Sequence, residues 1–124
     1  MTTKNLGARI AAWTARTFGP GSMLPRERAA RLLEEAAELA QVEGVPPHVV
    51  QRIVDRVFSG RPGDRLQEAA GVALCLVAYC EAIGADPIDL AEVEAMRVEA
   101  LPPEHFRKRH AAKVAYGAAE EPEP

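Results

Sequence analysis

Hydrophobic residues recur at helical spacing along most of the chain, and glycine or proline interrupts this pattern at residues 19–21, 44–47, 60–63, 84–87 and 102–103. Strand signals are almost absent, because β-branched residues are sparse and the helix formers alanine, leucine, glutamate and arginine dominate. The pattern therefore predicts an all-α protein. We expect a bundle of about five to six helices, over about 6–18, 25–43, 47–59, 66–78, 87 onward and 103–116.

The predicted helices differ in how much of their circumference is apolar. The segment over 25–43 gathers leucine and alanine on one side and its charges on the other, as an amphipathic helix does. The segment over 66–78 is apolar on every side except for Gln67 and Glu68, as expected of a helix surrounded by protein. Asp64 is placed to cap this helix, with Gln67 completing a capping-box pattern. The pattern therefore makes 66–78 the central helix of the fold.

Composition and charge narrow the class of protein. The chain has 124 residues, of which 48% are hydrophobic and 27% charged, and this fits one compact domain over residues 1–116. Residues 117–124 are rich in glutamate and proline and are predicted to form a disordered acidic tail. A net charge of −3 argues against a nucleic-acid partner, because binding to phosphate backbones requires an excess of basic residues.

The apolar segments of the chain do not resemble a targeting sequence. None has the features of a signal peptide or the roughly 20 apolar residues that span a bilayer, so we expect a cytoplasmic protein without a membrane partner. Cys75 and Cys80 lie about 140° apart around one predicted helix, which is poor geometry for a disulfide. Both cysteines are predicted to be buried, reduced thiols. Trp13 is expected to pack in the core rather than to stack on a base.

Three carboxylates share part of the helix predicted over 25–43. Glu34 and Glu38 are one turn apart, as are Glu35 and Glu38, so their like charges repel unless a cation lies among them. Magnesium suits such a site because it prefers oxygen ligands and retains waters that a substrate's phosphates can replace. The alternative is that these acids form the solvated face of an amphipathic helix. Glu68 favours a site, because a carboxylate in an apolar segment needs a partner, although in the first turn of its helix the dipole and solvent can also stabilise it.

The acids of both helices match a known motif. The pattern Glu-Glu-x-x-Glu on one helix, followed some tens of residues later by Glu-x-x-Asp on another, resembles that of the MazG-like all-α nucleoside triphosphate pyrophosphatases, especially small members from bacteria and their phages. In this chain the motif is formed by Glu34, Glu35, Glu38 and Glu68, with Gly71 in place of the aspartate. The order of the helices extends the resemblance over roughly residues 8–115.

The resemblance implies a magnesium-dependent hydrolase that forms a homodimer or homotetramer through its central helices, with manganese as an alternative ion. It places Glu35, Glu38 and Glu68 on the metal. Glu34 and Glu35 would serve in catalysis, with Glu34 as a further ligand or as the base that orients water. Water would attack the α-phosphorus of a nucleoside triphosphate and release a monophosphate and pyrophosphate.

Gly71 leaves the motif one carboxylate short, and two other acids lie between its halves. Asp64 is explained as a helix cap, whereas Asp55 is either a candidate to complete the site or a solvated acid on the polar side of its helix. Lys108 and Lys113 belong to the only dense basic stretch. They are candidates for binding the substrate's phosphates, or are hydrated cations that interact with the helix dipole.

Two functions therefore stay open. The leading hypothesis is a magnesium-dependent nucleotide pyrophosphohydrolase. The alternative is a degenerate MazG-like protein that binds nucleotide or a protein partner without catalysis, and both need the same core. A helix-turn-helix regulator is disfavoured because the segment over 66–78 is too apolar to lie in a DNA groove. The sequence also lacks the phosphate-loop, nucleophile-elbow and Cys-x-x-Cys motifs of several other enzyme classes.

Overall fold

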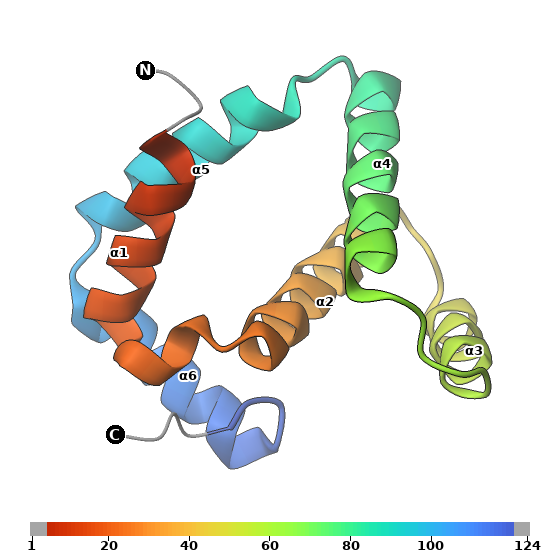
Figure 1. Cartoon of the computed structure of the whole chain (residues 1–124), viewed down its shortest axis with the longest axis horizontal. Coiled ribbons are helices and arrows are strands. Elements are labelled where there is room, and N and C mark those ends of the chain that lie inside the picture. The colour runs from red at the N-terminus through yellow and green to blue at the C-terminus, as the bar shows by residue number, and fades with distance from the viewer. Residues whose placement is uncertain (1–4, 121–124) are drawn as a thin grey trace. The chain divides into compact units, whose positions relative to one another are not determined.

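The computed structural model describes residues 5–120 and shows an all-α protein, as predicted (Figure 1). Within this part of the chain there are six α-helices, one short 3₁₀ helix and no strand. The α-helices are α1 (Leu6–Phe18), α2 (Pro25–Val42), α3 (Pro47–Phe58), α4 (Arg65–Ile83), α5 (Pro87–Ala100) and α6 (Pro103–Tyr116). The 3₁₀ helix η2 (Pro20–Met23) follows α1 and was not expected from the sequence, which shows only a break there.

Local sequence explains where α4 begins and ends. The Asp64 carboxylate accepts a hydrogen bond from the Gln67 backbone N–H at 3.0 Å, which confirms the predicted cap. Gly84 ends the helix in the left-handed conformation, with φ of 72°, which a residue with a side chain rarely adopts. The Ala85 backbone N–H then donates to the Cys80 carbonyl at 2.9 Å and satisfies one of the last carbonyls of the helix. The helix therefore extends past the apolar segment to the glycine break.

The chain divides into two compact units. The described residues of Met1–Leu32 and Ile88–Pro124 form one, here named the terminal unit, and Leu33–Pro87 form the other, the central unit. Helix α2 begins in the terminal unit and continues into the central unit. The prediction of a single domain over 1–116 stays a prediction.

The predicted acidic tail lies only partly within the described residues. Residues 121–124 lie outside them, whereas Glu120 forms an ion pair with Arg26 at 2.6 Å. The carbonyl of Ala118 accepts a hydrogen bond from the Arg31 guanidinium. The first residues after α6 therefore contact the first half of α2 within the terminal unit.

Aromatic rings form the core of the terminal unit. Trp13 packs edge to face against Phe106, with ring centroids 5.1 Å apart, and against Phe18 at 5.8 Å. Phe106 is buried, and Ala95 and Val98 of α5 are buried as well. Helices α1, α5 and α6 thus share one core, and the prediction that Trp13 packs in a core is confirmed.

Polar contacts fix the end of α1 in the same unit. Thr14, Thr17 and Ser22 are buried, and the Thr14 hydroxyl donates to the Ile10 carbonyl at 2.7 Å. The Ser22 hydroxyl lies 2.6 Å from the Gly19 carbonyl and 3.2 Å from that of Thr14. Buried hydroxyls with such partners avoid the cost of an unmade hydrogen bond. Helix η2 is therefore held against α1 by side chains as well as by its backbone.

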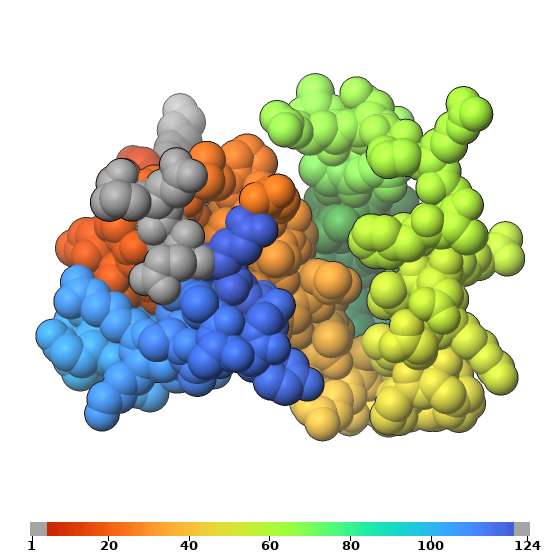
Figure 2. Space-filling model, turned by 90° about the horizontal axis from the view of Figure 1, so that it is seen from below, coloured from red at the N-terminus to blue at the C-terminus, as the bar shows by residue number. Residues whose placement is uncertain are grey.

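The central unit buries much less. Among its described residues Cys80 alone is buried, and α4 leaves leucine and valine side chains in solvent, among them Leu66, Leu74 and Val77. Figure 2 shows the side chains of α3, yellow to yellow-green, on the surface of this unit. The prediction that both cysteines are buried is wrong for Cys75, because α4 is not surrounded by protein within one chain.

Helix α4 is the one described helix that is long and apolar enough to cross a membrane, by length and composition alone. Its 19 residues remain almost entirely exposed within the chain. The core helix of a protein that functions in water passes the same test, so the feature is weak evidence for a membrane. Water is an unfavourable solvent for such an apolar helix, and the central unit by itself does not cover it.

Candidate functional site

Two of the predicted acids line the same pocket in the central unit. Glu34 and Glu38, one turn apart on α2, border a pocket of about 410 Å³ between α2 and the start of α3. The rest of the lining is mostly apolar and consists of Ala37, Gln41, Val45, Pro47, Val50, Gln51 and Val54. Glu35 does not line this pocket, because it is rotated about 100° from Glu34 around the helix. Of the predicted acids, the structure therefore brings Glu34 and Glu38 together at one pocket.

Glu68 is placed by the start of α4. It lies in the first turn of the helix and is exposed. Its carboxylate turns back toward the preceding loop, because a Cβ atom built on Gly63 would lie 2.6 Å from Glu68 Oε1. Solvent and the positive end of the helix dipole thus stabilise this acid in a single chain. Its position in an apolar segment needs no metal to explain it.

Helix α4 is attached to the end of α2 through a contact far from Glu68. The Tyr79 hydroxyl donates to Glu43 Oε2 at 2.7 Å, and this hydrogen bond to a carboxylate is the main reason that the pKa of Tyr79 is raised. Glu68 lies eleven residues earlier, about 16 Å along the helix axis. Sequence reasoning missed this contact, since nothing in the spacing of two residues 36 positions apart indicates it.

The predicted metal ligands do not gather within one chain. Among residues 5–120 no three His, Cys, Asp or Glu side chains lie close enough together to hold a metal ion. Asp55 accepts a hydrogen bond from the Gln51 amide at 2.9 Å on the exposed side of α3, and Asp64 caps α4. The ligand set of Glu35, Glu38 and Glu68 therefore stays a prediction that a single chain does not complete.

Comparison with known proteins adds no assignment. The chain matches no protein-family profile, no curated protein and no solved structure. Its function must therefore be argued from its own residues.

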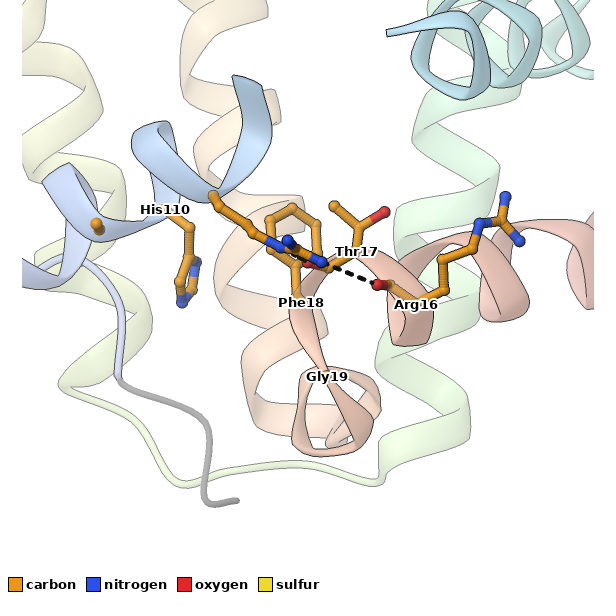
Figure 3. Close-up of a pocket in the computed structure, with 7 residues that line it drawn as sticks. Arg16, Thr17, Phe18, Gly19 and His110 are labelled. Atoms are coloured by element: carbon orange, nitrogen blue, oxygen red, sulfur yellow. Dashed lines mark hydrogen bonds between the residues drawn. The ribbon is translucent and has the colours of Figure 1, made fainter. Parts of the chain in front are cut away.

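The basic end of the chain forms a second pocket, in the terminal unit (Figure 3). This pocket, of about 470 Å³, lies between the end of α1 and α6. Lys108 and Lys113, the predicted phosphate ligands, do not line it. It is lined instead by Arg16, Thr17, Phe18, Gly19, Arg107, His110 and Ala111. The signal for this pocket in the sequence is the spacing of Arg107 and His110, which places them on one face of a helix.

Arg107 connects α6 to the end of α1. Its Nε donates to the Thr17 carbonyl at 2.8 Å and its Nη2 to the Arg16 carbonyl at 3.4 Å. These carbonyls belong to the last turn of α1, where intrahelical partners run out and the dipole is negative, so a guanidinium is well suited to them. Arg107 therefore has a structural role, and its Nη1 is not used in either contact.

Proposed function

We propose that the protein is a magnesium-dependent nucleotide pyrophosphohydrolase of the MazG-like type, which cleaves a nucleoside triphosphate to a monophosphate and pyrophosphate. It would act in the cytoplasm as a homo-oligomer. The all-α fold is compatible with this proposal, and the acidic motif on α2 and α4 motivates it.

The observation that carries the proposal is the pair of carboxylates on the central-unit pocket. Glu34 and Glu38 face the same space, and like charges one turn apart destabilise a helix by a few tenths of a kcal/mol. A divalent cation relieves that repulsion, and magnesium is the ion whose preference for oxygen ligands and retained waters suits a phosphate substrate. Manganese has similar ligand preferences and is the natural second ion to test.

The proposal requires more than one copy of the chain. A single chain does not group three of the acids, and α4, which carries Glu68, has no protein cover along most of its length. A second copy that packs on α4 would cover its leucines and valines and bring further carboxylates to the pocket on α2. Association and completion of the site are thus coupled in this proposal.

A binding protein without catalysis is the second candidate. Gly71 removes one acid from the motif, and the described part of a single chain lacks a complete ligand group. Both observations favour a protein that holds a nucleotide or a protein partner without hydrolysing it. The two candidates differ in whether pyrophosphate is released.

The test measures pyrophosphate release from a panel of canonical and modified nucleoside triphosphates, with magnesium or manganese. Glu38→Gln removes a carboxylate from the pocket, and Glu104→Gln is the matched control at an exposed position of α6 in the terminal unit. We expect wild type and Glu104→Gln to release pyrophosphate and Glu38→Gln to lose at least about 90% of the rate. Absence of release across the panel with both metals would leave the binding candidate in place.

Gly71→Asp sharpens the test by restoring the missing acid. A Cβ atom at Gly71 meets nothing within 4 Å, so an aspartate fits this position of α4 without displacing a neighbour. We expect metal-dependent release to rise roughly tenfold, in line with the effect of improved metal coordination. A matched Gly71→Asn, which adds similar volume without the charge, should not produce this rise. Equal activity of the two variants would show that the acid at this position is not part of the site.

A further inference from the structure

The pocket of the terminal unit combines a cation, an imidazole and an aromatic wall. The His110 and Phe18 rings lie with their centroids 5.5 Å apart and their planes inclined by 52°. Figure 3 shows His110 and Phe18 at the pocket from α6 and α1, whereas the Arg16 side chain extends away from His110. Arg107 spans the space between the two helices through its contacts with the α1 carbonyls. The pocket is thus built from α1, with the glycine that follows it, and α6.

The donors of this pocket are not fully used. His110 Nε2 is buried and has no hydrogen-bond partner among the described residues. Arg107 donates to the α1 carbonyls through Nε and Nη2, and its Nη1 takes part in neither of these two bonds. A buried polar atom without a partner is unfavourable, and a ligand that supplies an acceptor removes that cost.

The charge of the pocket selects the class of ligand. Its lining contains arginine and histidine and no acid, although the protein as a whole has a net charge of −3. An oxyanion is therefore favoured, and a phosphate carries more charge to match this surface than a single carboxylate does. The volume of about 470 Å³ also fits an organic ligand rather than a bare ion.

We propose that this pocket binds the phosphate group of a small organic phosphate through Arg107 and His110, with Phe18 as an apolar wall for the rest of the ligand. The site is separate from the carboxylate pocket of the central unit and requires no metal. Phosphate binding at this site therefore does not depend on the proposed hydrolase activity.

The test is calorimetric titration of the full chain with inorganic phosphate, ribose 5-phosphate and AMP in the presence of EDTA. Arg107→Gln removes the charge and retains an amide that can donate to the α1 carbonyls. His110→Phe retains the ring against Phe18 and removes the nitrogen. Arg109→Gln is the matched control, because it removes the same charge from an exposed position of α6 outside the pocket. Circular dichroism and Trp13 fluorescence confirm that each variant is folded.

We expect saturable binding of at least one of the organic phosphates, weakened roughly tenfold or more by Arg107→Gln and by His110→Phe and unchanged by Arg109→Gln. Tighter binding of AMP than of ribose 5-phosphate would show that the base contributes, and equal binding that the sugar phosphate suffices. Failure of all three compounds to bind wild type, or equal affinity in His110→Phe and wild type, would overturn the proposal. If Arg107→Gln does not fold, the affinity of His110→Phe for the organic phosphates decides the outcome. If the protein binds none of the three compounds in EDTA but still releases pyrophosphate with magnesium, this binding proposal fails while the proposed hydrolase activity stands.

Discussion

The terminal and central units use the same kind of helix in different ways. In the terminal unit, Phe106, Ala95 and Val98 are buried, and Trp13 packs edge to face against Phe18 and Phe106. In the central unit, α4 is the most continuously apolar helix of the chain, yet Cys80 is its one buried residue. Apolar composition alone therefore does not place a helix in the core of its own chain.

The two units therefore differ in how their helices are stabilised. A helix bundle is stabilised by apolar surface removed from water, at about 25 cal/mol per Å². The terminal unit removes part of that surface by internal packing, although Leu24, Val93 and Met96 stay exposed, whereas the central unit leaves nearly all of it exposed. In the proposed homo-oligomer a second copy would supply this cover.

The largest effect is expected in the aromatic core of the terminal unit. Phe106 is 8% exposed and Phe58, at the end of α3, is 80% exposed. Phe106→Ala should lower the free energy of unfolding by about 3–5 kcal/mol, because it leaves a cavity beside Trp13. Phe58→Ala should change it by less than about 0.5 kcal/mol in a monomer, as an exposed substitution does. Urea denaturation followed by circular dichroism, which reports the helices of both units, measures both changes, and equal losses would contradict the comparison.

The next effect concerns the exposed leucines of α4. Leu74 is 71% exposed, and Leu24, in the terminal unit, is 57% exposed. If a second copy covers α4, Leu74→Lys places a charge in an apolar interface and removes about 1.5–3 kcal/mol of burial per side chain. The dissociation constant should then rise roughly 100-fold or more. Leu24→Lys serves as the control and should leave association unchanged.

Sedimentation equilibrium across a range of concentrations measures this change. An oligomeric wild type that becomes monomeric in Leu74→Lys alone supports the inference. A wild type that is monomeric at high micromolar concentration in detergent-free buffer would mean that α4 is not covered by a copy of the chain.

Most of the fold could be predicted from local sequence. Glycine and proline breaks set the helix bounds, and the Asp64 cap was predicted because capping depends on residues three apart in the chain. The 3₁₀ helix after α1 could not be predicted, since its hydroxyl contacts join Ser22 to Thr14, eight residues away. The exposure of Cys75 was also missed, because periodicity shows that a helix is apolar and not what surrounds it.

Less of the candidate sites could be predicted. Glu34 and Glu38 were paired by their spacing on one helix, and the structure does place both on one pocket. The position of Glu68 relative to them depends on how α2 and α4 pack, which local patterns do not contain. The basic stretch likewise suggested Lys108 and Lys113 as phosphate ligands. The packing of α6 against α1, which the sequence does not show, places Arg107 and His110 at the pocket instead.

The smallest effect tests how α1 and α5 are joined within the terminal unit. Arg9 donates to Glu99 at 2.7 Å and to Glu92 at 3.4 Å. The hydrogen bond from Arg9 is the main reason that the pKa of Glu99 is lowered from its ordinary value of 4.5. Arg26, whose side chain is 83% exposed and pairs with the 73% exposed side chain of Glu120, offers a more solvated ion pair for comparison. Solvent screening should reduce the contribution of that pair to the free energy of unfolding to nearly zero.

The pH dependence follows from the direction of this shift. A carboxyl group whose pKa is lower in the folded state than in the unfolded state stabilises the fold above pH 4.5, and this contribution is lost as the pH falls through the folded pKa. Arg9→Met should therefore lower the melting temperature slightly at pH 7, and the difference from wild type should shrink once the pH is well below 4.5. Arg26→Met should match wild type at both pH values. A deficit of Arg9→Met that is the same at pH 7 and at low pH would indicate that Arg9 acts through the packing of its aliphatic chain against α5 rather than through its charge.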